Sequence, residues 1–178
     1  GFTVSGSAEA RRMILLEVRL PRALLGFMVG GTLGLAGAVL QGYLRNPLAE
    51  PGILGISGGA ALGAVIAIHS GLAQVVALAL PLAGLTGAAL ATLALTVLAG
   101  RGTGSVTLIL AGVAVSSLAA ALTSLALNLA PNPFAASEML YWLMGSLTDR
   151  SLTHVWLAAP LMAIGCLLLA STARDLDA

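Results

Sequence analysis

Stretches without any charged residue constrain this chain more than any other feature of its sequence. Four of them separate the charged residues, at 23–44, 51–100, 102–137 and 151–173. Hydrocarbon cannot satisfy an open backbone, so stretches of this kind cross a bilayer as helices of about 20 mainly apolar residues. The chain is therefore predicted to be an integral membrane protein.

Composition supports this prediction and excludes other classes of protein. Hydrophobic residues make up 58% of the chain and charged residues 8%, too few charges to cover the surface of a soluble domain. The apolar content excludes a disordered chain, and a net charge of +1 argues against nucleic acid as a partner. With Cys166 as the only cysteine, the chain can form no internal disulfide.

The charge-free stretches predict an all-α fold, a polytopic transmembrane helix bundle. The stretch 51–100 has room for two spans, with a turn near His69-Ser70-Gly71. The runs lack the apolar/polar alternation of a membrane barrel, so strands are not expected. A short helix near the outer interface is expected at 137–146, capped by Ser137. We expect five spans, at about 23–44, 53–69, 73–99, 105–127 and 152–170.

Two sets of glycines recur at intervals of four residues. One set lies in the first expected span and the other at the start of the second. Each set places a smooth stripe along one helix face, where a neighbouring backbone can approach closely. This spacing predicts tight packing in a multi-helix bundle, with lining of a substrate pathway as the alternative. The sets are Gly26, Gly30 and Gly34, and Gly55, Gly59 and Gly63.

The loop after the first expected span contains two prolines four residues apart, Pro47 and Pro51. They must break the helix and fix a rigid turn. Asn46 precedes the first proline, where its amide can bridge freed backbone groups. Physical reasoning alone leaves two interpretations open, a plain surface turn and a constriction on a transport path.

Several strings in this region and beyond it resemble the FecCD family, the permease subunits of ABC importers for iron–siderophores, haem and vitamin B12. They occur in the family's order across residues 19–147. The strings are Arg-Leu-Pro-Arg at 19–22, Leu-Ala-Gly-Ala-Val-Leu-Gln at 35–41, Asn-Pro-Leu-Ala-Glu-Pro-Gly-Ile-Leu-Gly at 46–55, Leu-Ile-Leu-Ala-Gly-Val-Ala at 108–114, and Tyr-Trp-Leu-Met-Gly-Ser-Leu at 141–147.

The resemblance implies a permease that moves an iron–siderophore, haem or cobalamin-type chelate across the bacterial inner membrane. Family members have ten spans, so residues 1–178 are expected to form a partial permease domain, an internal piece covering about spans two to six. The implied partners are a second permease subunit (a copy or a paralogue), two cytoplasmic ATPases, a periplasmic or lipid-anchored binding protein, and membrane lipid. The strings do not distinguish between the three chelates.

Arg19 and Arg22 are candidates for docking the binding protein. In related permeases, arginines at the matching place meet acidic residues of the docked partner. Their spacing of three puts both side chains on one face of a helical start, where they offer two forked donors. The alternative is snorkelling of both side chains toward lipid headgroups.

Asn46, Leu48 and Ser105 are candidates for a gate at the cytoplasmic end of the pathway. By resemblance, Asn46 and Leu48 match a gate below the substrate cavity, and Ser105 lies near a second gate before the fourth span. Small polar and apolar side chains from two subunits can shut a pore without adding fixed charge. The expected outer helix at 137–146 has two interpretations, an aromatic belt segment or a helix at the outer mouth.

Enzymatic activity is not expected of this chain, and neither is a bound cofactor or metal. The histidines, the cysteine and the acids are far apart in the sequence, and without lysine there is no phosphate loop ending in Lys. ATP would therefore be hydrolysed by a partner. An ion-coupled secondary transporter is the alternative, disfavoured because the expected spans contain no acid. A structural membrane subunit comes third.

Overall fold

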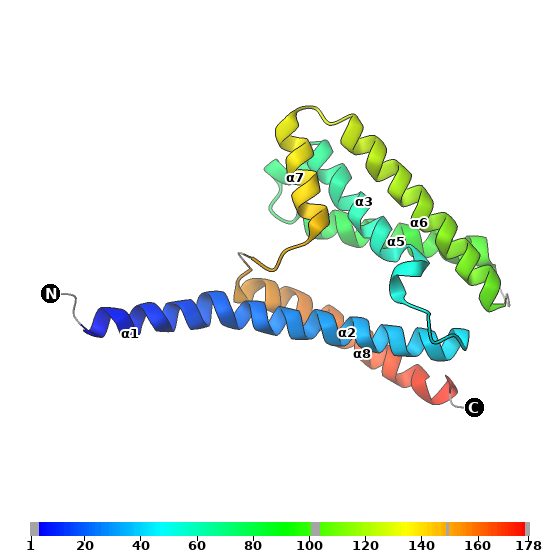
Figure 1. The fold of residues 1–178 in the computed structure, drawn as a ribbon, viewed down its shortest axis with the longest axis horizontal. Helices are drawn as coiled ribbons and strands as arrows, with labels where there is room; N and C mark the ends of the chain where they lie inside the picture. The colour runs from blue at the N-terminus through cyan, green and yellow to red at the C-terminus, as the bar shows by residue number, and fades with distance from the viewer. Residues whose placement is uncertain (1–3, 101–103, 149, 177–178) are drawn as a thin grey trace. The chain divides into compact units, whose positions relative to one another are not determined.

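The computed structural model describes residues 4–100, 104–148 and 150–176, and every regular element in these ranges is helical. The elements follow one another along the chain as Figure 1 shows. They are α1 (Val4–Met13), η1 (Ile14–Arg19), α2 (Leu20–Leu44), η2 (Pro51–Leu54), α3 (Ile56–His69), α4 (Leu72–Val75), α5 (Ala79–Ala99), α6 (Ser105–Asn128), α7 (Pro133–Met144) and α8 (Leu152–Leu176).

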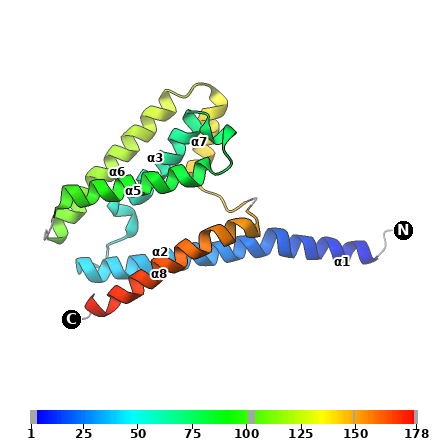
Figure 2. The ribbon, with the colours of Figure 1, turned by 180° about the vertical axis from the view of Figure 1, so that it is seen from behind.

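The chain divides into two compact units. The first unit consists of Gly1–Gly42 together with Ser146–Ala178, and the second is Tyr43–Gly145. In the first unit α1, the π-helical η1 and α2 follow one another without a break. Figures 1 and 2 both show α8 lying alongside α2. The Thr32 hydroxyl of α2 lies 3.8 Å from the Cys166 thiol of α8, which confirms the pairing of the two helices.

In the second unit α3 is the central helix, in contact with η2, α5, α6 and α7. Two clusters of buried apolar residues form the core of this unit. The first joins α5 to α6, and the second joins the end of α3 to α7. The first cluster comprises Ala91, Leu95, Ala99, Ala111 and Val115, and the second comprises Val65, Ile68 and Met139.

Glycines allow α3 and α5 to approach to backbone contact. A Cβ added at Gly63 would overlap the carbonyl oxygen of Ala83, and one added at Gly87 would overlap that of Gly59. Part of the second glycine set therefore packs as predicted. The first set does not meet a helix backbone: among the described residues, a Cβ at Gly30 or Gly34 would contact nothing within 4 Å.

Four helical segments are long and apolar enough to cross a membrane in the part of the chain that the structure describes. They are Ala8–Leu44, Ala79–Ala99, Ser105–Asn128 and Leu152–Ser171, and α3 is a shorter apolar helix. The segment 53–69, predicted as a span, is helical but is not one continuous α-helix. Its first residues belong to the 3₁₀ helix η2, and α3 has only 14 residues.

The span expected at 73–99 is also interrupted, because α4 ends at Val75 and α5 begins at Ala79. Pro81 explains the break. In a continuous helix its ring would clash with the carbonyl of Ala77, whereas in the first turn of a new helix its missing N–H costs nothing.

The short helix predicted at 137–146 exists but begins earlier, as α7 at Pro133. Its cap is Asn132, whose side-chain oxygen accepts a 2.8 Å hydrogen bond from the amide of Ala135. Ser137 lies inside the helix, where its hydroxyl donates to the carbonyl of Pro133. Asn at the N-cap followed by Pro at the first position is a favoured helix start, which outweighed the signal from Ser137.

Candidate functional site: the two-proline turn and its surroundings

The two-proline turn is held by hydrogen bonds of Asn46. Its side-chain oxygen accepts from the amide of Leu48 at 2.9 Å, and its carbonyl accepts from the amide of Ala49 at 3.1 Å. Arg45, just before it, ends the helix with φ at 49°, a left-handed conformation unusual for a residue with a side chain. The expected bridging role of the Asn46 amide is therefore confirmed. Leu48 is left 83% exposed at the tip of the turn.

After the turn the chain does not enter an α-helix directly. It first forms the 3₁₀ helix η2, which is followed by Gly55 with a φ of 79°. η2 lies against α6, one of the helices long enough to span a membrane. Ser116 of α6 donates its hydroxyl to the carbonyl of Ile53 at 3.4 Å. This bond gives the Ile53 carbonyl a hydrogen-bond partner. Irregular backbone beside a membrane helix needs such partners, because hydrocarbon supplies none.

Ser105 is the first residue of α6, and its side chain is exposed. Gly104 stands at the N-cap position without a capping side chain. Within the described residues, Ser105 forms no hydrogen bond to the turn at Asn46. Figures 1 and 2 place the start of α6 and the segment around η2 toward the same end of the second unit. Two segments that carry gate candidates thus lie toward one end of this unit, and no hydrogen bond among the described residues joins Ser105 to Asn46.

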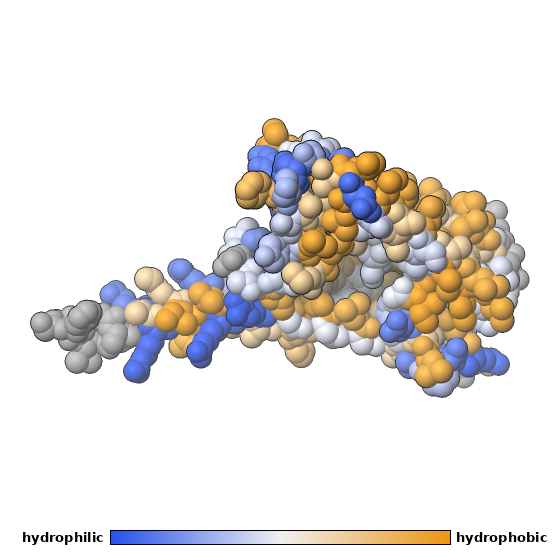
Figure 3. Space-filling model, turned by 45° about the horizontal axis from the view of Figure 1, so that its top comes forward, coloured by the Kyte–Doolittle hydropathy of each residue, from blue (hydrophilic) through white to orange (hydrophobic). Residues whose placement is uncertain are grey.

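Arg19 and Arg22 lie on the continuous helix of the first unit, and both side chains are exposed. Arg19 is the last residue of η1, and Arg22 belongs to the first turn of α2. Short π-helical segments are rare and frequently occur at functional sites. Figure 3 shows hydrophilic side chains interspersed with hydrophobic ones along the N-terminal part of this helix, and hydrophobic side chains over much of the rest of the surface in view.

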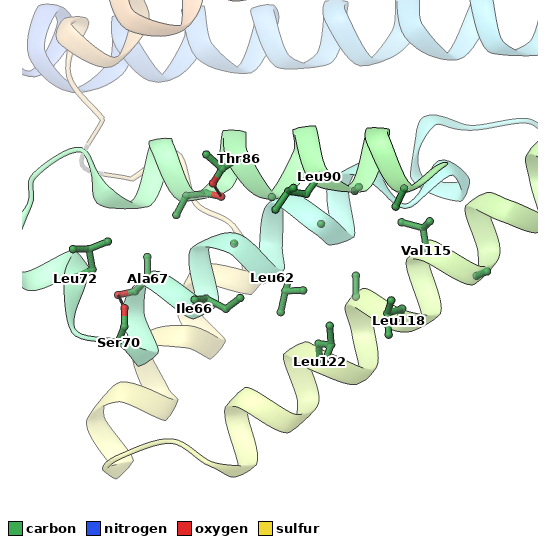
Figure 4. Close-up of a pocket in the computed structure, with 18 of the residues that line it drawn as sticks. Leu62, Ile66, Ala67, Ser70, Leu72, Thr86, Leu90, Val115, Leu118 and Leu122 are labelled. Atoms are coloured by element: carbon green, nitrogen blue, oxygen red, sulfur yellow. Dashed lines mark hydrogen bonds between the residues drawn. The ribbon is translucent and has the colours of Figure 1, made fainter. Parts of the chain in front are cut away.

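A groove with a cavity of about 470 Å³ opens between α3, α5 and α6. Figure 4 shows leucine side chains from all three helices lining it, among them Leu62, Leu90 and Leu118. Ser70 and Thr86 are also in its wall. Their hydroxyls donate to carbonyls of their own chain segment, those of Ala67 and Ala83. The groove therefore presents an apolar surface.

A second cavity, of about 390 Å³, lies between the end of α3 and the start of α7. Its wall includes His69, Gln74, Asn132 and Glu138. The Nδ1 atom of His69 is buried and has no hydrogen-bond partner among the described residues. This cavity could not be predicted from the sequence, because its two groups of lining residues, at 68–74 and 131–138, are more than 50 positions apart and carry no local motif.

The groove between α3, α5 and α6 can enclose an apolar surface but offers few polar groups to bind or react with a ligand. Among the described residues, no group of three or more His, Cys, Asp and Glu could hold a metal ion. The face of α6 at Gly112 and Ser116, on which η2 packs, was not predicted from the sequence. The string at 108–114 includes Gly112 but does not indicate what packs on it.

Comparison with known proteins agrees with this architecture. The chain is 39% identical over 175 residues to the cobalamin import system permease protein BtuC of Halobacterium salinarum, covering 97% of this chain and 46% of that protein. It is 37% identical over 152 residues to the vitamin B12 import system permease protein BtuC of Salmonella paratyphi A, covering 85% and 46%. The chain thus spans about half the length of these relatives.

A solved structure shares the fold. It is described as an inward-facing conformation of an ABC transporter of metal-chelate type, with a TM-score of 0.86 and 28% identity. The match covers 94% of this chain and 53% of the solved chain. The FecCD transport family itself matches residues 2–178. The family match extends over nearly every residue, and the described part of the chain has four helices of membrane length. The chain is therefore a multi-pass membrane protein that belongs to the FecCD transport family.

Proposed function

We propose that this chain is part of the permease subunit of an ABC importer that moves a cobalamin-type metal chelate across the cell membrane. The observation that carries the proposal is the 39% identity to a cobalamin import permease over 97% of this chain. Apolar and small side chains dominate the described helices, and they suit a bulky, partly apolar chelate enclosed without strong ligation. A bare metal ion would need converging carboxylate or imidazole ligands.

The proposal includes the partners of such an importer. ATP hydrolysis belongs to two cytoplasmic ATPase subunits, since this chain contains no lysine to complete a phosphate-binding loop. A second permease subunit completes the pathway, and a binding protein outside the membrane delivers the chelate. Arg19 and Arg22 dock that binding protein, a role supported by their exposure and their shared helix face.

Asn46, Leu48 and Ser105 form the gate on the cytoplasmic side. The hydrogen-bonded turn supports this role for the first two, because it presents Leu48 outward on a fixed backbone. Leu48→Cys, in a full-length background in which Cys166 and every other native cysteine are replaced by Ser, is expected to change its labelling rate when ATP is added to the assembled importer. Val75, also 83% exposed, provides a matched control position whose labelling should stay constant. A constant rate at both positions would remove Leu48 from the gate.

Uptake by the full-length protein tests the proposed function. The protein would be reconstituted in liposomes with its ATPase and binding protein, and supplied in turn with labelled cyanocobalamin, a ferric siderophore and haem. We expect ATP-dependent accumulation of cyanocobalamin, abolished by a catalytically inactive ATPase. Accumulation of an iron chelate in place of cyanocobalamin would show that the substrate is an iron chelate. If none of the three chelates accumulates in an ATP-dependent manner, the proposal is refuted.

The same liposomes separate the importer from an ion-coupled transporter. An ionophore that collapses the proton gradient, added with ATP present, should leave uptake by an ABC importer unchanged. Uptake through an ion-coupled transporter would stop. The structure favours the first outcome because the described parts of α2, α5 and α6 contain no carboxylate that could relay protons within the membrane.

A further inference from the structure

η2 is fixed on α6 by contact between two backbones. A Cβ added at Gly112 of α6 would lie 2.6 Å from the carbonyl oxygen of Ile53 and 3.0 Å from the Cα atom of Leu54. Real Cβ atoms essentially never approach backbone atoms at the shorter distance. Only glycine at position 112 therefore allows η2 to lie where it does.

One helical turn further along α6, a second contact holds the same segment. A Cβ added at Gly55 would lie 2.8 Å from the amide nitrogen of Ser116 and 2.8 Å from a methyl carbon of Val115. Ser116 also donates its hydroxyl to the carbonyl of Ile53. We call these two contacts, Ile53–Gly55 against Gly112–Ser116, the η2–α6 clasp. Gly112 and Ser116 are four residues apart and so share one face of α6.

The clasp joins the two segments to which the gate residues belong. On one side, the chain from Asn46 to Ile53 is short and stiff: two prolines restrict it, and the amide of Ile53 donates to the carbonyl of Glu50. On the other side, Ser105 lies seven residues before Gly112 in the same helix, a rise of roughly 10 Å. Neither path from the clasp to a gate residue contains a flexible linker.

We infer that the η2–α6 clasp makes the turn at Asn46–Leu48 and the start of α6 move as one body, so that both gate segments change position together. The inference rests on the proposed function for the meaning of the gate. The rigid coupling itself is a property of this chain and needs no transport to be measured. Gly55, Gly112 and Ser116 are then positioning residues, since they act through the turn and not on the chelate.

Distance measurements in the full-length protein, assembled with its ATPase, test the coupling. Spin labels at Leu48 and Ser105, in a background in which Cys166 and every other native cysteine are replaced by Ser, should give one narrow distance distribution that is the same with and without ATP. Gly112→Ala forces the clasp apart, so this variant should show a broadened distribution that changes with ATP. Gly84→Ala is the matched control, because its added Cβ would meet only the carbonyl oxygen of Ala60, at 3.7 Å.

The outcomes separate the coupling from the function. The coupling is overturned if the distance between the labels at 48 and 105 shifts with ATP while the clasp residues are native. It is also overturned if Gly112→Ala gives the same distance distribution as Gly84→Ala. If Gly112→Ala does not fold, Ser116→Ala decides, since it removes the bond to Ile53 without adding volume and should broaden the distribution. Labels at Leu48 of both subunits report on the gate separately: no response to ATP there refutes the gate but leaves the clasp standing.

Discussion

Gly55 and Gly71 have nearly the same backbone conformation, with φ at 79° and 73°, but different surroundings. A Cβ at Gly55 would press on the backbone of α6, whereas one at Gly71 would meet nothing within 4 Å among the described residues. The left-handed conformation alone costs an ordinary residue roughly 1–2 kcal/mol. The two positions therefore separate conformational strain from steric overlap.

We expect Gly55→Ala to lower the thermal unfolding temperature of the full-length protein in detergent more than Gly71→Ala does. Gly71→Ala should lose only the conformational term, while Gly55→Ala adds an overlap costing about 1–3 kcal/mol more. Scanning fluorimetry of both variants beside the unmodified protein provides the comparison. Equal losses would mean that the contact of Gly55 with α6 contributes nothing to stability.

Asn132 and Ser137 provide a second paired test at the residue scale. Asn132 caps α7, and its replacement by Ala should destabilise the protein by about 0.5–2 kcal/mol. Ser137 donates to Pro133 within the helix, and Ser137→Ala should have little effect because Ala is a good helix former. Chemical denaturation monitored through tryptophan fluorescence would rank the two variants. A larger effect at Ser137 would restore the cap suggested by the sequence.

At the scale of elements, the close approach of α3 and α5 is the feature most sensitive to added volume. Gly63→Ala places a methyl group on the carbonyl of Ala83, so the two helices must separate. We expect a loss of about 1–3 kcal/mol, the usual cost of overpacking. Gly30→Ala in α2, where the added Cβ meets none of the described residues, should be near neutral. Thermal unfolding of both variants would test this, and similar losses would refute the argument.

Helices were predictable from the sequence because the bilayer permits little else for long charge-free stretches. Their interruptions were less so. Hydropathy alone did not separate α4 from α5, although Pro81 signals the break once its clash with a preceding carbonyl is considered. Gly55 was assigned to a helix stripe by its spacing, but it ends η2 in a left-handed conformation. Spacing along a sequence cannot reveal where a helix starts.

The candidate site was predictable in its local part only. The turn at Asn46 follows from Asn beside proline, and the structure has the expected hydrogen bond. The contact of η2 with Gly112 joins positions about 60 residues apart in sequence, and no local pattern encodes it. The roles of Arg19, Arg22, Leu48 and Ser105 remain predictions from family resemblance.

At the scale of the whole molecule, docking of the binding protein should depend on charge. Arg19→Glu combined with Arg22→Glu in the full-length protein should weaken docking by roughly 2- to 30-fold, the effect of two exposed ion pairs. The loss should be larger at low salt, because salt screens exposed charges. Surface plasmon resonance against the immobilised permease would measure the dissociation constant at several salt concentrations.

Arg11 and Arg12 supply the matched control for this experiment. They are exposed on the same continuous helix, and their reversal to Glu changes the net charge by the same amount. Docking should be nearly unaffected by Arg11→Glu with Arg12→Glu if Arg19 and Arg22 make specific contacts. An equal loss from both pairs would mean that the partner senses only the general field of the helix, and unchanged docking in both would leave lipid headgroups as the partners of Arg19 and Arg22.

The 14 residues of α3 rise only about 21 Å, against roughly 30 Å for the hydrocarbon core of a typical bilayer. Its neighbours α5 and α6 are long enough to cross that core, so α3 leaves part of the thickness to the irregular backbone that precedes it. Hydrocarbon offers no hydrogen-bond partner to such backbone. Protein must therefore shield this segment from lipid, so that the neighbours of α3, and not the bilayer, keep this short helix in place.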